Sequence, residues 1–138
     1  GLTRPYDISL FGGYAYVSDR LGNRVARCEV SAAGDLGPCT NSFFFNGIAR
    51  PTNLNFNPAD PTYLYIGSNT FPAVYKCPVA GSGCIAFLSF GLPSGVSVYD
   101  GRAYVIDGSE VLLCELQANG DLQTPCANQG VQAGGSPF

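Results

Sequence analysis

The chain of 138 residues has no histidine and no methionine, and only 12% of its residues are charged. Without histidine, a Ser-His-Asp or Cys-His catalytic arrangement is excluded in its usual form. The formal net charge is -3 and no basic run is present, which argues against nucleic acid as a partner. No apolar run approaches the roughly 18 residues of a membrane-spanning helix, so we expect no membrane span.

Helical periodicity is also nearly absent. No apolar stretch with a 3.6-residue period extends past two turns, and 18 glycines and 10 prolines interrupt the chain. The chain opens on Gly1 and shows no charged segment followed by an apolar one, as a leader would. The scarcity of helical periodicity predicts an all-β protein. The start at Gly1 without a leader pattern favours a mature or trimmed form of a longer product.

Three copies of a four-strand unit fill most of the chain. The copies open with Pro5, Pro51 and Pro93, so the period is 46 and then 42 residues. In the first copy, apolar residues alternate with polar ones between turn residues, a pattern typical of short strands. The expected strands of that copy lie at 6–10, 14–17, 25–30 and 36–39.

Matching residues recur at the same places in each copy. Tyr16 and Tyr104 each follow the opening proline by 11 positions, and Tyr65 follows by 14 because the loop before it is longer. The turn Gly34-Asp35-Leu36 returns as Gly120-Asp121-Leu122. The spacing therefore predicts one structural repeat used three times.

The six cysteines fall two to a copy. Buried free thiols and a metal site are alternatives, but zinc favours close Cys-x-x-Cys pairs, usually with histidine. The spacing favours disulfides that join the third strand of each copy to the fourth. The expected pairs are Cys28 with Cys39, Cys77 with Cys84, and Cys114 with Cys126. Disulfides imply an oxidising compartment, so we expect an extracellular or cell-surface protein.

The proline start, the Tyr-Val second strand, the cysteine-containing third strand and the Gly-Asp-Leu turn resemble the YVTN-type repeats of secreted β-propellers, and the wider NHL-like class. The resemblance covers nearly all of residues 4–126 and implies three four-stranded antiparallel blades in one domain, forming an incomplete ring. The expected blades span about 4–45, 46–90 and 91–130, with residues 131–138 as a C-terminal tail. Propellers of this kind include lactonase-like enzymes, binding proteins and surface structural proteins.

Three blades are too few to close a ring, since closed propellers have about 4–8. Open blade faces and strand edges favour association. Pro137 lies 44 residues after Pro93, where a fourth blade would start. The expected contacts with another subunit are Phe43, Phe44, Phe45, Pro137 and Phe138. Two chains could close a six-bladed ring, or a head-to-tail contact could build a filament, and the filament is favoured slightly.

A metal-dependent hydrolase is the strongest enzymatic alternative. The resemblance places Asp7, Asn53 and Gly95, each two residues after its proline, towards a central channel. Two oxygen ligands and a glycine make a poor Ca²⁺ site, so we expect Asp7 and Asn53 to satisfy backbone groups near the proline turns. Asp19, Asn69 and Asp107 follow the expected second strands and are interpreted as turn residues.

Regularly placed tyrosines raise the alternative of a carbohydrate-binding protein. These are Tyr14, Tyr16, Tyr63, Tyr65 and Tyr104. Packing between blades explains their spacing better than sugar binding does. The sequence therefore predicts a non-enzymatic, extracellular structural protein that associates with copies of itself, without a cofactor or metal, and with glycans as the other possible partner.

Overall fold

The computed structural model describes residues 1–40, 48–68, 70, 72–80 and 83–132. Within them the chain forms three four-stranded antiparallel sheets. The first sheet contains β1 (Pro5–Phe11), β2 (Tyr14–Asp19), β3 (Arg24–Val30) and β4 (Leu36–Thr40). The second contains β5 (Pro51–Phe56), β6 (Tyr63–Ser68), β7 (Ala73–Pro78) and β8 (Ile85–Phe87). The third contains β9 (Pro93–Tyr99), β10 (Arg102–Asp107), β11 (Glu110–Leu116) and β12 (Leu122–Gln132).

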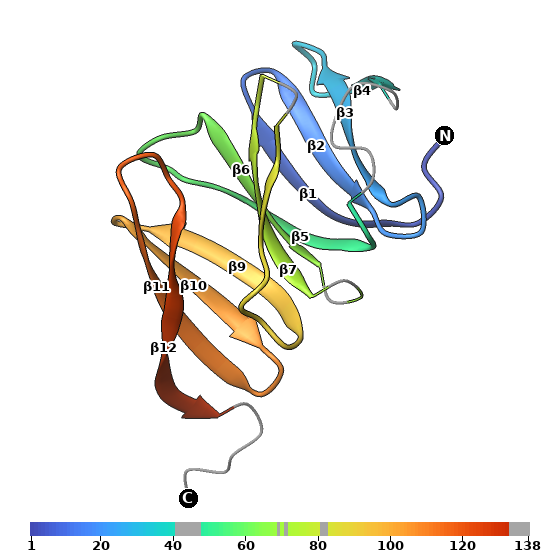
Figure 1. The fold of residues 1–138 in the computed structure, drawn as a ribbon. Coiled ribbons are helices and arrows are strands. Elements are labelled where there is room, and N and C mark those ends of the chain that lie inside the picture. The colour runs from blue at the N-terminus through green and yellow to red at the C-terminus, as the bar shows by residue number, and fades with distance from the viewer. Residues whose placement is uncertain (41–47, 69, 71, 81–82, 133–138) are drawn as a thin grey trace, which may run out of the picture.

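Each sheet is a blade in which the strands follow one another in chain order. We call the three sheets blade 1, blade 2 and blade 3. Figure 1 shows them side by side, with blade 2 in the middle between blade 1 and blade 3. The inner strand β5 contacts β1 on one side and β9 on the other. The predicted fold is confirmed: a partial propeller of three four-stranded antiparallel blades.

The blades form where the sequence joins alternating strands by tight turns. Gly12 and Gly13, between β1 and β2, both have positive φ angles, of 62° and 81°. Asp100 and Gly101, between β9 and β10, have φ angles of 50° and 72°. Two successive positive φ angles are typical of the type I′ turn, whose twist matches that of a hairpin. Asp100 and Gly101 thus form the tight turn of the β9–β10 hairpin, in which Tyr99 pairs with Arg102.

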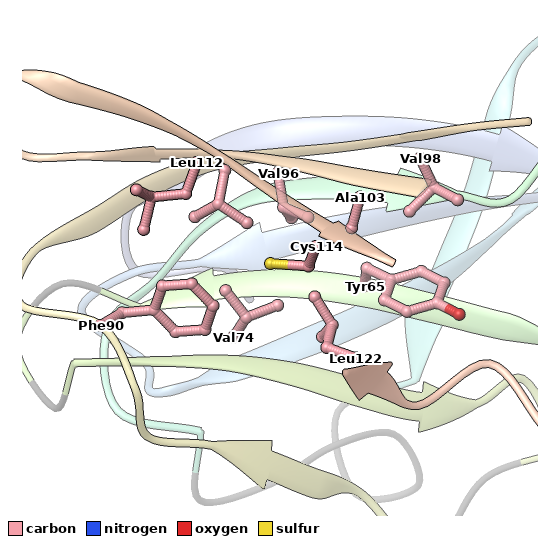
Figure 2. Close-up of a cluster of buried hydrophobic side chains, with 10 residues drawn as sticks. Tyr65, Val74, Phe90, Val96, Val98, Ala103, Leu112, Cys114 and Leu122 are labelled. Atoms are coloured by element: carbon pink, nitrogen blue, oxygen red, sulfur yellow. The ribbon is translucent and has the colours of Figure 1, made fainter. Parts of the chain in front are cut away.

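Two hydrophobic cores lie between neighbouring blades. The core between blades 1 and 2 is built from buried side chains of both blades, among them Tyr16, Val25, Leu54, Leu64 and Ile66. The core between blades 2 and 3 is shown in Figure 2. Its buried members include Tyr65, Val74, Phe90, Val96, Val98, Ala103, Leu112, Cys114 and Leu122. Blade 2 therefore buries both of its faces.

One disulfide joins the third strand of each blade to the fourth, or to the segment leading into it. The pairs are Cys28–Cys39, Cys77–Cys84 and Cys114–Cys126, so the predicted pairing is confirmed. In each pair the third-strand cysteine, Cys28, Cys77 or Cys114, is fully buried. Each bond ties an outer strand that buries little surface of its own. Three disulfides in a chain of this size indicate an oxidising environment.

Regular structure in the described part of the chain is entirely strand. No helix there is long and apolar enough to cross a membrane.

Candidate functional site

Asp7 and Asn53 join the inner strands of neighbouring blades. The Leu54 N–H of blade 2 donates to Asp7 Oδ2 of blade 1 at 2.8 Å. The Val96 N–H of blade 3 donates to Asn53 Oδ1 of blade 2 at 3.0 Å, and Asn53 Nδ2 donates to the Val96 carbonyl at 2.8 Å. We call these bonds the inner-strand clasp. In each case, the residue two positions after the opening proline of one blade binds the residue three positions after the opening proline of the next blade.

Blade 3 lacks the group that would continue the clasp. Gly95 holds the position of Asp7 and Asn53, and Ile106 lies opposite it on β10. A Cβ atom built on Gly95 would lie 3.2 Å from Ile106 Cδ1. The corresponding residues on the second strands of blades 1 and 2 are small, Ser18 and Gly67. In blade 3 an apolar side chain therefore lies where the first two blades have a polar one.

The clasp defines what Asp7 and Asn53 do in this fold. Besides Leu54, Asp7 binds its own neighbour, because the Ile8 N–H donates to Asp7 Oδ1 at 2.8 Å. Both carboxylate oxygens thus accept backbone N–H groups. The backbone-binding role agrees with the prediction, but the Leu54 and Val96 groups belong to the next blade rather than to the local turn. No group of three or more metal-binding side chains gathers within the described ranges.

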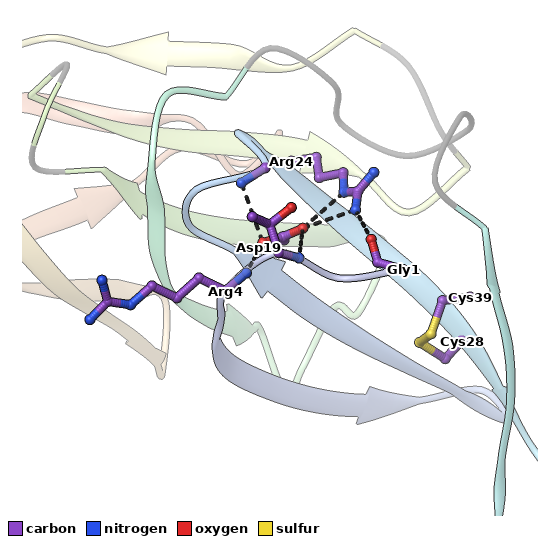
Figure 3. Close-up of polar contacts among 8 residues, drawn as sticks. Gly1, Arg4, Asp19, Arg24, Cys28 and Cys39 are labelled. Atoms are coloured by element: carbon purple, nitrogen blue, oxygen red, sulfur yellow. Dashed lines mark hydrogen bonds and ion pairs between the residues drawn. A yellow bond between two sulfur atoms is a disulfide. The ribbon is translucent and has the colours of Figure 1, made fainter.

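Asp19 is the most heavily hydrogen-bonded carboxylate of blade 1 (Figure 3). Its buried side chain accepts bonds from the backbone N–H groups of Thr3 at 2.9 Å and Arg4 at 2.7 Å. The Arg24 guanidinium lies 3.0 Å from Asp19 Oδ2 and also donates to the Gly1 carbonyl. Asp19 therefore fixes the segment that leads into β1.

The environment of Asp19 shifts its pKa in opposite directions. Burial of the carboxylate raises the pKa, but the Arg4 and Thr3 N–H groups, the Arg24 guanidinium and the Gly22 N–H together lower it below the usual value of 3.8. The ionised form is therefore the one that the fold stabilises.

The interpretation of Asp19 and Asp107 as turn residues is wrong, because the second strands run two residues further than expected. Asp19 is the last residue of β2 and Asp107 the last of β10. Asp107 accepts the N–H groups of Gly91 and Leu92, just before Pro93, as Asp19 does before Pro5. In blade 2 the aligned residue is Ser68, which pairs with Pro51. Asn69 lies outside the described residues.

The tyrosines of the second strands differ in burial from blade to blade. Tyr16 is 1% exposed and Tyr65 is 0% exposed, because each packs against the following blade. Tyr104, at the same position of blade 3, is 37% exposed. Tyr14 and Tyr63 are half-buried and lie beneath the Arg27 and Lys76 cations, whose distances to the ring centroids are 4.3 Å and 4.2 Å.

Blade 1 has an open apolar face on the side away from blade 2. Ile8 is 48% exposed and Leu10 is 63% exposed, although the aligned residues of blade 3, Val96 and Val98, are buried. A hollow of about 330 Å³ on this face is lined mainly by Leu2, Pro5, Tyr6, Asp7, Ile8, Val17 and Leu36. We call this surface the leading face.

Blade 3 has the second open face, on the side away from blade 2. It carries Tyr104 and Ile106, which is 47% exposed, with Val111 beside them on β11. A hollow of about 310 Å³ lies over Gly95 and is lined by Asn53, Val96, Ser97, Tyr104, Ile106 and Val111. We call this surface the trailing face.

Sequence reasoning expected open blade faces and strand edges, but it did not identify the residues that form the leading and trailing faces. It placed the subunit contacts at Phe43, Phe44, Phe45, Pro137 and Phe138, all of which lie outside the described residues. Among the described residues, the exposed apolar side chains at the centre of the two faces, Ile8, Leu10, Tyr104 and Ile106, belong to strands. A usable signal was present, because the residues of the leading face have the same spacing from Pro5 as core residues of blades 2 and 3 have from their prolines.

Several solved structures are similar to the chain, although no family model and no curated protein matches it. A functionally unknown protein from Desulfotomaculum acetoxidans DSM 771 superposes with a TM-score of 0.70 and 18% identity, over 93% of this chain and 43% of that one. Virginiamycin B lyase from Staphylococcus aureus gives 0.59 and 17%, over 86% and 40%. A chain of the nidogen/laminin complex gives 0.60 and 18%, over 90% and 47%.

These likenesses show the fold, which is that of β-propeller proteins. The chain spans less than half the length of each of the three structures.

Proposed function

We propose that this protein is a structural subunit that associates with copies of itself, the trailing face of one copy packing on the leading face of the next. It acts outside the cell or at its surface, as a member of the secreted YVTN-type repeat proteins. The observation that carries the proposal is that the two open faces are the two halves of a junction that the chain forms twice internally.

The internal junctions define both halves. In each, a second-strand tyrosine of one blade, Tyr16 or Tyr65, packs on the apolar face of the blade that follows. The trailing face offers the tyrosine half through Tyr104. The leading face offers the other half through Ile8 and Leu10. Large exposed apolar faces of this kind mark interaction surfaces.

The backbone groups of the two faces also fit one another. Gly95 provides no acceptor for a clasp with a following blade. The Ile8 N–H, which corresponds to the clasped Leu54 and Val96 amides, already donates to Asp7 Oδ1. The trailing face thus provides no clasp, and the leading face leaves no amide at this position that requires one.

A head-to-tail contact gives an open filament unless its rotation closes a ring. The missing clasp supports the filament, because the contact between copies then differs from the two internal junctions and need not repeat their rotation. A closed six-bladed pair of chains is the alternative assembly.

Electron microscopy of the purified, oxidised chain tests the proposal, with Leu10→Lys as the matched variant. We expect filaments from the wild type and none from Leu10→Lys, since the new charge lies in the contact. Closed rings of two chains would overturn the filament while preserving self-association. Isolated single chains in both samples would overturn the proposal itself.

A further inference from the structure

The turn between β11 and β12, residues 117–121, makes a second polar contact between blade 3 and blade 2, away from the clasp. We call it the outer turn of blade 3. Tyr65 donates its hydroxyl proton to the Gly120 carbonyl at 2.8 Å. Lys76 Nζ donates to the Asn119 carbonyl at 2.9 Å and forms an ion pair with Asp121 Oδ1 at 2.5 Å. The Lys76 side chain is only 5% exposed. This contact therefore fixes the position of the blade 3 turn against β6 and β7 of blade 2.

Blade 1 has the same turn, and none of the described strands of the other blades packs against it. The Ser31 N–H donates to the Asp35 carbonyl at 2.9 Å, and the Gln117 N–H donates to the Asp121 carbonyl at 2.8 Å. Gly34 and Gly120 have φ angles of 91° and 85°. The two turns therefore have the same backbone conformation.

Their surroundings differ completely. A Cβ atom built on Gly120 would lie 2.8 Å from the Tyr65 hydroxyl oxygen and 3.3 Å from Tyr63 Cδ2, whereas one on Gly34 would meet nothing within 4 Å among the described atoms. Leu122, next to the blade 3 turn, is 3% exposed, and its counterpart Leu36 is 55% exposed. The Asp35 carboxylate makes no ion pair with any described residue. The blade 1 turn is thus an unused copy of a contact surface.

The trailing face carries a cation suited to this turn, at a shifted position. In blade 2 the residue that pairs with Tyr65 is Lys76. At the aligned position of blade 3, the residue that pairs with Tyr104 is Leu113, so blade 3 has no lysine there. Arg102 occupies the place that Tyr63 has in blade 2, one pleat along the same face. Because Lys76 Nζ lies 4.2 Å from the Tyr63 ring centroid, a side chain extending from the Tyr63 position reaches the same region as the lysine ammonium.

Arg102 is available for a further partner. Its side chain is 44% exposed, and Nε donates to Glu115 Oε1 at 3.2 Å, on a glutamate that is 58% exposed. A terminal guanidinium nitrogen also lies 4.0 Å from Asp100 Oδ2, on an aspartate that is 78% exposed. An exposed pair of this kind is weak. The guanidinium has five donors, so it can bind a further carboxylate without leaving these two.

We propose that Arg102 of one copy forms an ion pair with Asp35 of the next copy, and that this pair fixes the register of the trailing face against the leading face. The inference rests on the proposed self-association. The Tyr104 hydroxyl then meets the Gly34 carbonyl of the next copy, as Tyr65 meets Gly120 within the chain. A second copy of this chain is the occupant because it supplies both the apolar face and the carboxylate.

Two charge reversals, Arg102→Glu and Asp35→Arg, test the pair in the full oxidised chain by sedimentation equilibrium. Alone, each variant sets like charges against one another at every contact, so we expect association roughly tenfold weaker or more. Mixed in equal amounts, the two variants complement each other, because every contact between one variant and the other again sets a cation against a carboxylate. We expect the mixture to associate about as tightly as the wild type.

Arg50→Glu is the control, because it makes the same charge change near the junction of blades 1 and 2, where the Arg50 N–H binds Asn23 Oδ1. It should associate like the wild type. Thermal unfolding of each variant checks that it is folded. If the wild type associates but the single variants match it, or the mixture is no tighter than either variant, the ion pair is overturned and self-association stands. If the wild type is monomeric at every concentration, both the self-association and the Arg102–Asp35 ion pair are overturned.

Discussion

The junction between blades 2 and 3 and the leading face of blade 1 use the same positions of the repeat in opposite ways. Four positions are compared: the opening proline, two first-strand residues, and the leucine after the outer turn. At the junction they are the buried residues Pro93, Val96, Val98 and Leu122, and on the leading face they are the exposed residues Pro5, Ile8, Leu10 and Leu36. The two sets are equally apolar, so their exposure reflects the missing neighbour and not a more polar sequence.

The trailing face differs from the junctions in kind as well as in exposure. Blades 1 and 2 each direct a polar side chain, Asp7 or Asn53, at the backbone of the next blade. Blade 3 has Gly95 and the apolar Ile106 instead. Each internal junction thus includes hydrogen bonds from a side chain of one blade to the backbone of the next, whereas Gly95 offers no side chain for such a bond on the trailing face.

The largest effect should come from comparing Tyr65→Ala with Tyr104→Ala. Loss of the buried Tyr65 ring leaves a cavity between blades 2 and 3 and should cost about 3–5 kcal/mol of unfolding free energy. The same change at Tyr104 should cost less than about 0.5 kcal/mol in the monomer, since the ring is partly exposed. Urea unfolding of both variants, disulfides intact and at concentrations below association, measures the difference. Equal losses would mean that the Tyr104 ring is already packed within the chain, as the Tyr65 ring is, and would contradict an open trailing face.

Asp121→Asn and Asp35→Asn compare the occupied turn with the unused one. The first variant leaves the Lys76 ammonium buried without its counter-charge, which should cost about 3 kcal/mol. The second removes a carboxylate that makes no ion pair with any described residue, and it should leave the monomer within about 0.5 kcal/mol of the wild type. Urea unfolding under the same conditions measures the loss of unfolding free energy in each variant. A large loss for Asp35→Asn would show that this turn is already in use within the chain.

Asp19→Asn should cost about 2–3 kcal/mol at neutral pH, since hydrogen bonds to a charged group are lost. Because the fold lowers the pKa of Asp19 below 3.8, its stabilisation is complete above that value and is lost as the pH falls through the pKa of the folded state. The gap between wild type and variant should therefore narrow in acid. Unfolding curves across this range measure it, and a constant gap would contradict the role given to the carboxylate.

The smallest effect should come from the clasp. Asn53→Ala leaves the Val96 N–H and carbonyl without their side-chain partner and should cost about 1–2 kcal/mol. Gly95→Ala adds a methyl group whose one close contact, at 3.2 Å, is with Cδ1 at the flexible end of the Ile106 side chain, and it should change the stability by less than about 0.5 kcal/mol. Thermal unfolding of the pair tests the comparison. If Asn53→Ala is as stable as the wild type, the clasp is not a stabilising contact.

The blades and the disulfides could be predicted because both follow from local pattern. Alternation with period two sets which residues of a strand share a face, and three aligned copies show where each cysteine falls. The ends of the second strands were missed, because Ser18-Asp19 and Ile106-Asp107 contain polar residues that are also common in turns. Their carboxylates fold back to bind the chain just before the proline, which no local pattern reveals.

The clasp and the open faces could not be read from one repeat alone. Asp7 and Asn53 bind backbone groups 47 and 43 residues away in the sequence, so their role depends on how neighbouring blades pack. The aligned copies show that blade 3 has Gly95 where blade 2 has Asn53. They also show Ile106 where blade 2 has Gly67. Only the structure shows that these two positions face each other across β9 and β10, so that Ile106 fills the space beside Gly95. Ile8 and Leu10 look like core residues because, in the other blades, their counterparts are.

The central claim is that the trailing and leading faces cover each other between copies. Sedimentation equilibrium of the oxidised wild-type chain over a range of concentrations tests it most directly. We expect an average mass that rises with concentration well above the 14.5 kDa of one chain, and we expect Ile8→Lys to abolish this rise without unfolding the protein. A mass of 14.5 kDa at every concentration would contradict it.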